Sequence, residues 1–325
     1  MDFARSVRMA KFTISNKEIR GPLNLKETIL SAQTSEPEWR LQGELFINVK
    51  ELDGIPVKYS LNQRGTTDHY NIDVEFLSAR GETKGTERAL REHLNQTLGL
   101  KDDLLSFYRE YSSEKEPLSC TFRGLRGLRL MRGTNLYESL LCSILSQNNS
   151  AKRWNQIARL IMKNYGRRVR LPDGSSSFLF PSPAKIAQLT LRELQSRTSA
   201  GYRAKSVVAV SRMIAEKELR LEELRKLDYE EALEVLLQLH GVGPKVADCF
   251  LLYGLGKMEA APVDLWIHRI VTEHYFGGRK ITRVNTARFL RERFGIWAGY
   301  AQLYLFDYAR RTSMKESRAK RLHAS

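Results

Sequence analysis

The feature that most constrains this chain is a short glycine-rich segment, residues 239–245, with the sequence Leu-His-Gly-Val-Gly-Pro-Lys. Two glycines and a proline within four positions favour a tight hairpin and cannot continue a helix. Upstream, Asp228 and Glu231 have the spacing of a capping box, and apolar residues follow at helical intervals. Downstream, Pro244 suits the first position of a second helix. Residues 228–253 therefore predict a helix-hairpin-helix.

The hairpin is a candidate binding site for phosphate. Because Gly241 and Gly243 have no side chains, the backbone N–H groups of Gly241, Val242 and Gly243 can approach an anion beside a helix N-terminus. Such contacts hold DNA through its backbone without reading sequence. The chain carries 53 Lys and Arg against 37 Asp and Glu, a formal charge of +16, which favours a nucleic-acid partner. An ordinary packing corner in a soluble basic protein remains the alternative.

Two residues near the hairpin are candidates for chemistry. Lys245 lies in the first turn of the second predicted helix, where its charge opposes the helix dipole and contributes little to stability. Asp264 follows 19 residues later, immediately before another predicted helix, where an aspartate caps the N-terminus. A carboxylate near a nucleophilic amine also stabilises a sugar cation as a base departs. Position alone favours the plainer reading of both, a solvated lysine and an N-cap.

The periodicity of the remaining chain predicts an α+β protein. Tyr70, Ile72, Val74 and Phe76 alternate with polar residues, and two apolar runs flank the turn pair Asp53-Gly54, so much of residues 11–77 reads as an antiparallel sheet. The segment 30–39 is expected to be an ordered loop, and 171–183 a loop rich in Pro, Gly and Ser. We expect a sheet domain with trailing helices over 1–115, and a helical domain with a basic C-terminal tail over 116–325.

The cysteines and the apolar runs bound the setting. Cys120, Cys142 and Cys249 are few and widely spaced, so they predict neither a disulfide framework nor a metal site. No apolar run approaches the roughly 20 residues that span a bilayer, and the first residues lack the apolar core of a signal peptide. We expect an intracellular protein, in the cytoplasm or nucleoid, or in the nucleus of a eukaryote.

Residues 241–249, Gly-Val-Gly-Pro-Lys-Val-Ala-Asp-Cys, with Pro-Val-Asp at 262–264, resemble the helix-hairpin-helix glycosylase superfamily. Within it they most resemble the 8-oxoguanine DNA glycosylase/AP lyases, and the likeness covers most of residues 121–310. The resemblance implies that Lys245 attacks the sugar C1′, giving a Schiff base and then β-elimination, and that Asp264 helps to expel the base. A lysine at this position implies a bifunctional enzyme.

Two more segments resemble family elements that touch DNA. Residues 146–153, Ser-Gln-Asn-Asn-Ser-Ala-Lys-Arg, resemble the loop that contacts the cytosine left without a partner, which makes Asn148 and Arg153 candidates. Tyr202, in the run Gly-Tyr-Arg-Ala-Lys, resembles the tyrosine that wedges into the duplex. A polar loop at a helix end and a tyrosine in the core are the respective alternatives.

The resemblance also implies a pocket for the flipped base. Residues 298–306 resemble the segment whose glutamine reads the Watson–Crick edge and whose phenylalanine stacks on the base, so Gln302 and Phe306 are candidates. They are four residues apart and share a helix face. Cys249 matches the cysteine on the opposite face of the base. Without the resemblance, core packing is the preferred reading for Phe306 and Cys249.

One family position departs from the pattern. Residues 31–34, Ser-Ala-Gln-Thr, resemble a loop whose glycine carbonyl accepts the N7–H of 8-oxoguanine, and here that residue is Ala32. Its carbonyl can still accept if the backbone angles suit a residue with a Cβ atom. No cysteine follows Cys249, so the four-cysteine iron–sulfur cluster of related enzymes is not expected.

Together these features predict a bifunctional DNA glycosylase/AP lyase of base excision repair that removes 8-oxoguanine from double-stranded DNA. We expect it to act as a monomer, without a metal or organic cofactor and without a membrane partner. Two alternatives stay open. One is an alkylpurine DNA glycosylase of the same superfamily, and the other is a non-catalytic helix-hairpin-helix DNA-binding protein, which would need neither Lys245 nor Asp264.

Overall fold

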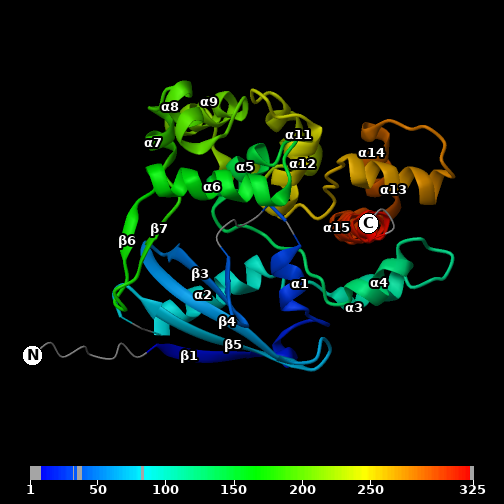
Figure 1. The fold of residues 1–325 in the computed structure, drawn as a ribbon, viewed down its shortest axis with the longest axis horizontal. Helices are drawn as coiled ribbons and strands as arrows, with labels where there is room; N and C mark the ends of the chain where they lie inside the picture. The colour runs from blue at the N-terminus through cyan, green and yellow to red at the C-terminus, as the bar shows by residue number, and fades with distance from the viewer. Residues whose placement is uncertain (1–8, 32, 35–38, 82–83, 323–325) are drawn as a thin grey trace, which may run out of the picture.

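The structure is a computed structural model that describes residues 9–31, 33–34, 39–81 and 84–322, with side chains as far as Thr312. A five-stranded antiparallel sheet lies below a group of helices, with further helices beside them (Figure 1). Its strands run in the order β1-β5-β4-β3-β2. Their bounds are β1 (Ala10–Ser15), β2 (Arg40–Gln42), β3 (Leu45–Leu52), β4 (Ile55–Gly65) and β5 (Tyr70–Ser78).

The predicted strands and their turn are confirmed. Ile72, Val74 and Phe76 of β5 are buried, as the alternation requires. Asp53 and Gly54 join β3 to β4 with φ angles of 49° and 75°, and two positive φ values belong to the tight turn that matches the twist of paired strands. The α+β prediction, an N-terminal antiparallel sheet followed by helices, is therefore correct.

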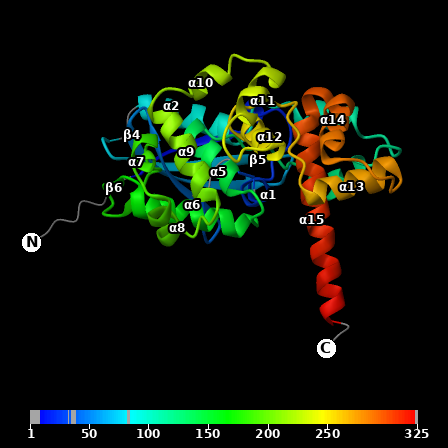
Figure 2. The same ribbon diagram turned by 90° about the horizontal axis from the view of Figure 1, so that it is seen from above.

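Helices occupy most of the described chain after residue 84. Their bounds are α2 (Lys84–Thr97), α3 (Leu104–Glu110), α4 (Ser119–Leu125), α5 (Leu136–Leu145), α6 (Ala151–Tyr165), α7 (Pro183–Ala187), α8 (Leu191–Thr198), α9 (Arg203–Ala215), α10 (Leu221–Leu224), α11 (Tyr229–Leu237), α12 (Pro244–Tyr253), α13 (Leu265–Phe276), α14 (Arg283–Phe294) and α15 (Ala298–Leu322). Short 3₁₀ turns cover Asn16–Glu18 and Gly295–Trp297. The last helix, α15, runs well beyond the body of the molecule (Figure 2).

Two local predictions were incomplete. The segment 171–183 holds a strand, β7 (Ser176–Phe178), which pairs with β6 (Arg168–Arg170) in a two-stranded hairpin. A short helix, α1 (Leu25–Leu30), interrupts the stretch that was read as mostly β, and Asn24 caps it by accepting from the N–H of Glu27. After α1, Ser31, Gln33 and Thr34 form neither helix nor strand, as expected of a loop.

The buried apolar residues form two cores. One lies between the sheet and α2, which contributes Leu90 and Leu94, with Leu98 directly after the helix, and the other joins the helices from α3 onward. The boundary at residues 115 and 116 stays a prediction, and the buried residues of α3 belong to the helical core. Lys50 of β3 and Glu138 of α5 form a buried ion pair, 2.8 Å between Nζ and Oε1, that links sheet and helices. A buried ion pair needs good geometry to offset desolvation, so it fixes how the two parts dock.

The helix-hairpin-helix prediction is confirmed. Asp228 and Glu231 exchange hydrogen bonds as a capping box at the start of α11, and Pro244 occupies the first turn of α12. Val246, Phe250 and the rest of the apolar face of α12 pack into the helical core. None of the helices in the described ranges has the length and apolar character needed to cross a membrane.

Candidate active site

The two hairpin glycines have different surroundings. Gly241 has a φ of +76°, and a Cβ atom there would lie 2.1 Å from Oγ of Ser206 in α9. At Gly243, φ is −98° and ψ is 178°, and a Cβ atom would point into open space. The fold therefore requires glycine at 241, whereas at 243 the absence of a side chain leaves room for something outside the protein.

The hairpin presents free N–H groups. Val242 does not take part in this way, since its N–H donates to the carbonyl of Leu239 at 3.0 Å and its side chain is buried. For the N–H groups of Gly241, Gly243 and Lys245, the described residues supply no acceptor. Those three donors, at and just before the start of α12, are free to donate to an anion, and the helix dipole adds positive potential there. Val242 was predicted to offer its N–H group to DNA, but that group is already bonded within the turn. Its buried side chain anchors the turn instead.

Lys245 is held beside the end of α5. Its Nζ donates to Oγ of Ser146 at 2.8 Å, and the Ser146 hydroxyl in turn donates to the carbonyl of Ser143 at 2.8 Å. Ser146 is buried while Lys245 is partly exposed, so the amine sits at the edge of the core. This contact fixes the position of the amine and leaves it open to a reactant.

Asp264 has the capping role that the sequence predicts, and it has a spare oxygen. Its Oδ1 accepts from the N–H groups of Trp266 and Ile267 at 2.9 and 3.0 Å, at the start of α13. Within the described part of the chain, Oδ2 accepts no hydrogen bond. Two backbone donors therefore orient the carboxylate while its second oxygen stays available.

The buried wall behind Lys245 consists of Cys249, Tyr253 and Gln302. Burial raises the pKa of the Cys249 thiol, and the nearby charge of Lys245 opposes that rise. The charge of Asp264 adds to the rise in the pKa of both Cys249 and Tyr253. The hydroxyl of Tyr253 donates to Oε1 of Gln302 at 3.4 Å. The predicted residues Lys245, Asp264, Cys249 and Gln302 therefore share one neighbourhood.

Phe306 and Ala32 are placed less decisively. Phe306 follows Gln302 by one turn of α15 and is half-buried against the helical core, which fits both core packing and a base-stacking surface. Ala32 lies outside the described residues. Beside it, the Gln33 amide donates to Ser31 Oγ at 2.7 Å and to the Arg129 carbonyl at 2.9 Å.

The segments predicted to contact DNA meet at the surface. Asn148, at the left-handed φ of 49°, donates from Nδ2 to the Tyr202 hydroxyl at 3.1 Å. The Tyr202 side chain is 57% exposed, so the alternative of a core tyrosine is wrong. The guanidinium of Arg203 lies 4.5 Å from the centre of the Tyr202 ring and donates to the carbonyl of Gln147 at 2.7 Å, which braces the pair. Arg153 is exposed in the first turn of α6.

Sequence reasoning missed two members of the site, Ser146 and Tyr253. Tyr253 could have been found, because it follows Cys249 by four residues and Lys245 by eight, on one face of α12. Ser146 could not, since its contact with Lys245 spans 99 residues.

The described residues contain no group of three or more His, Cys, Asp or Glu that could hold a metal ion.

Similarity to known proteins agrees with this geometry. A model of the family described as "HhH-GPD superfamily base excision DNA repair protein" matches residues 141–295. The probable N-glycosylase/DNA lyase of Methanothermobacter thermautotrophicus is 34% identical over 90% of this chain and 96% of its own length. The N-glycosylase/DNA lyase OGG1 of Arabidopsis thaliana is 28% identical over 88% of this chain and 79% of its own.

Solved structures share the fold. The Clostridium acetobutylicum 8-oxoguanine glycosylase/lyase, in complex with double-stranded DNA that contains cytosine opposite 8-oxoguanine, superposes with a TM-score of 0.77 at 24% identity, covering 96% of this chain and 100% of that one.

A DNA-3-methyladenine glycosylase of Bacillus subtilis is more distant in sequence, at 23% identity over 74% of this chain and 78% of its own. The alkylpurine glycosylases are thus the remoter relatives.

Proposed function

Because this chain belongs to the HhH-GPD superfamily of base excision DNA repair proteins, we propose that it removes 8-oxoguanine from duplex DNA and then cleaves the strand. It is a DNA glycosylase and AP lyase, as its relatives are named. The observation that carries the proposal is the placement of Lys245, which is held by Ser146 at the end of a hairpin with free N–H groups and which acts, like Asp264, on the thiol of Cys249. Its substrate is genomic DNA, so it acts inside the cell.

Binding begins at the phosphates. The N–H groups of Gly241, Gly243 and Lys245 donate to a phosphate oxygen. The exposed Tyr202 ring enters the base stack beside the lesion, and Asn148 and Arg153 contact the opposite strand. Wedging costs a few kcal/mol of stacking, which is offset most easily at a damaged base. The target nucleotide then rotates out toward α12 and α15.

The flipped base lies between Cys249 and Phe306, with its Watson–Crick edge toward Gln302. Cys249 and Gln302 are only 3% and 4% exposed, so the base must displace the side chains that cover them. Tyr253 donates to Gln302 Oε1, and a carbonyl oxygen has a second lone pair that can accept the N1–H of the purine. The Gln302 amide N–H₂ is then directed at the O6 acceptor. This pattern suits a guanine edge.

Lys245 supplies the nucleophile. The neutral amine nitrogen forms a bond to C1′ as the N-glycosidic bond breaks, and the base leaves with the electron pair of the broken bond and takes up the proton that the newly bonded Lys245 nitrogen releases. Asp264 Oδ2 stabilises the positive charge that develops on the sugar. Ring opening gives a Schiff base between Lys245 and C1′, and loss of a C2′ proton then expels the 3′ phosphate by β-elimination.

The two alternatives are less well supported. A non-catalytic DNA-binding module has no need of a lysine held by a buried serine, or of a capping aspartate with a free oxygen. An alkylpurine glycosylase fits less well, because a fixed amide facing the base matches the donors and acceptors of a guanine edge. The lower identity to the 3-methyladenine enzyme points the same way.

Borohydride trapping tests the proposal. We expect a covalent complex with a duplex that contains 8-oxoguanine opposite cytosine, lost in Lys245→Gln while DNA binding persists. Lys226→Gln, at an exposed position between α10 and α11, is the matched control and should trap as the parent does. Undiminished trapping in Lys245→Gln would refute the role of Lys245. Faster excision of 3-methyladenine than of 8-oxoguanine would favour the alkylpurine alternative instead.

A further inference from the structure

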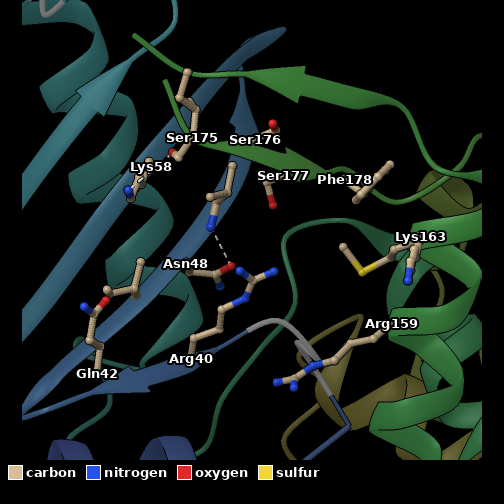
Figure 3. Close-up of a pocket in the computed structure, with 14 residues that line it drawn as sticks. Arg40, Gln42, Asn48, Lys58, Arg159, Lys163, Ser175, Ser176, Ser177 and Phe178 are labelled. Atoms are coloured by element: carbon tan, nitrogen blue, oxygen red, sulfur yellow. Dashed lines mark hydrogen bonds between the residues drawn. The ribbon is translucent and has the colours of Figure 1, made fainter. Parts of the chain in front are cut away.

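A cavity of about 470 Å³ lies between the sheet, the β6–β7 hairpin and α6, and it shares no lining residue with the candidate active site (Figure 3). Arg40 reaches it from β2, Lys58 from β4, and Arg159 and Lys163 from α6 (Figure 3). Three consecutive serines, 175–177, line the side formed by the hairpin. The walls therefore combine cationic groups with hydroxyl groups.

A second cavity of about 610 Å³ continues along the same helix. It shares Arg159 and Lys163 with the first and extends to Lys152 in the first turn of α6, with Trp39 and Arg310 in its wall. We call the two cavities together the α6 trough. Because Lys152 and Lys163 are eleven residues apart on one helix, the trough runs about 16 Å along α6.

The lining of the α6 trough is strongly basic. Among the described residues that line either cavity there is no Asp or Glu, and the charged side chains are all cationic: Arg40, Lys58, Lys152, Arg159, Lys163 and Arg310. Lys58 is paired with Asp173 at 2.6 Å and Arg310 with Asp307 at 2.5 Å. A net positive charge remains over the trough, in a chain with a formal charge of +16. Such a surface attracts a polyanion.

Two residues in the wall also carry buried N–H groups without a partner. Trp39 Nε1 and Arg310 Nε have no hydrogen-bond acceptor in the described part of the chain. A buried donor without an acceptor is destabilising, so these side chains gain a hydrogen bond if they turn toward a ligand rich in acceptor oxygens. Phosphate oxygens meet that requirement.

The position of the trough identifies the ligand. It begins at Lys152, next to Arg153 and directly after the segment whose Asn148 contacts DNA in the proposed function, on which this inference rests. We propose that the α6 trough binds the phosphodiester backbone of the DNA that flanks the lesion. Since each strand of B-form DNA has a phosphate about every 3.4 Å along the axis, the trough has the length of about five phosphates. This site extends the footprint and takes no part in the reaction.

Binding to duplexes of two lengths tests the proposal. In a Lys245→Gln background, which prevents turnover, Arg40→Gln and Lys163→Gln are combined, and affinity is measured against salt. One duplex is centred on the lesion and has about six base pairs, which leaves about 10 Å of DNA on either side and is too short to fill the trough, and others are extended by about ten base pairs on either side. Lys217→Gln with Lys226→Gln removes the same charge at two exposed positions and is the matched control.

The double variant should bind the short duplex as the parent does and should bind one of the extended duplexes more weakly. Salt weakens binding less when fewer phosphates are contacted. Between roughly 50 and 200 mM salt, the loss of affinity for that duplex should therefore be about tenfold smaller for the double variant than for the parent. The control should change neither value. Equal loss on short and extended duplexes, or no loss on either, would overturn the proposal. Hydroxyl-radical footprinting gives a second reading, since the protection lost should lie on one side of the lesion only.

Excision separates this proposal from the proposed reaction. With Lys245 present, the Arg40→Gln/Lys163→Gln chain should excise 8-oxoguanine from the short duplex at the parent's rate. If the loss of binding did not depend on duplex length while excision was normal, the proposed role of the trough would be refuted and the proposed reaction would not. Length-dependent binding in a chain that excises nothing would refute the reaction alone.

Discussion

Replacing Gly241 by alanine is expected to destabilise the protein by about 2–5 kcal/mol. The left-handed backbone, with φ at +76°, costs an alanine about 1–2 kcal/mol. The new Cβ atom would also lie 2.1 Å from Ser206 Oγ and 3.2 Å from Ser206 Cβ, and such overpacking in a buried contact adds about 1–3 kcal/mol. Urea unfolding of the purified variant measures the sum.

A double-mutant cycle separates the two contributions. In a Ser206→Ala background the hydroxyl is absent and only the 3.2 Å approach to the Cβ atom remains, so Gly241→Ala should cost mainly the backbone strain, about 1–2 kcal/mol. An equal cost of Gly241→Ala in both backgrounds would show that the close approach of α9 to the hairpin is not what requires glycine. A loss below about 0.5 kcal/mol in the parent would contradict the left-handed conformation as well.

Gly243→Ala is the matched control within the same hairpin. Its backbone is extended and its Cβ atom would meet nothing. Alanine reduces the freedom of the unfolded chain but is a poorer N-cap than glycine, and these effects of about 0.5–1 kcal/mol offset each other. We expect unchanged stability with weaker DNA binding, since the methyl group occupies the approach to the free N–H groups. A stable Gly243→Ala chain with undiminished binding would refute the phosphate site.

Two further predictions concern the wall of the site. Tyr253→Phe removes the hydrogen bond to Gln302 and should lower kcat/KM for 8-oxoguanine by about 2- to 10-fold. Strand cleavage at a preformed abasic site needs no base pocket and should stay unchanged, so an equal loss on both substrates would point to a merely structural role. Burial raises the pKa of Asp248 to about 6, although the Tyr229 hydroxyl donates to it at 2.6 Å and acts the other way. The protonated form is therefore favoured in the folded state, and the stability it contributes is present below about pH 4 and lost as the pH rises to about 6. In urea unfolding, Asp248→Asn should gain up to about 3 kcal/mol relative to the parent across that interval, and a constant difference would contradict the raised pKa.

Local patterns predicted much of this protein. Asp228 and Asp264 each cap the helix that follows them, because a side-chain oxygen next to free backbone N–H groups acts within three residues. The alternation in β5 and the Asp53-Gly54 turn were read correctly for the same reason. The family resemblance added the roles of Lys245 and its neighbours, which position alone left undecided, and those roles stay predictions until they are tested.

The predictions that were incomplete depend on partners distant in sequence. The strand β7 forms because β6 lies beside it, and its own residues read as a polar loop. The short helix α1 packs Leu25 into the core of the sheet, and neither its length nor its pattern distinguishes it within a β-rich stretch. Short segments take their structure from tertiary context when their own preference is weak.

The sequence by itself determined the hairpin and the two helices that flank it. These depend on steric limits at glycine and proline and on hydrogen bonds between residues a few positions apart. Only the tertiary structure decided that Ser146 holds Lys245, that Tyr253 meets Gln302 and that cations from β2, β4 and α6 line one trough. Those contacts join residues that are far apart in the chain, and the packing of the buried cores brings them together.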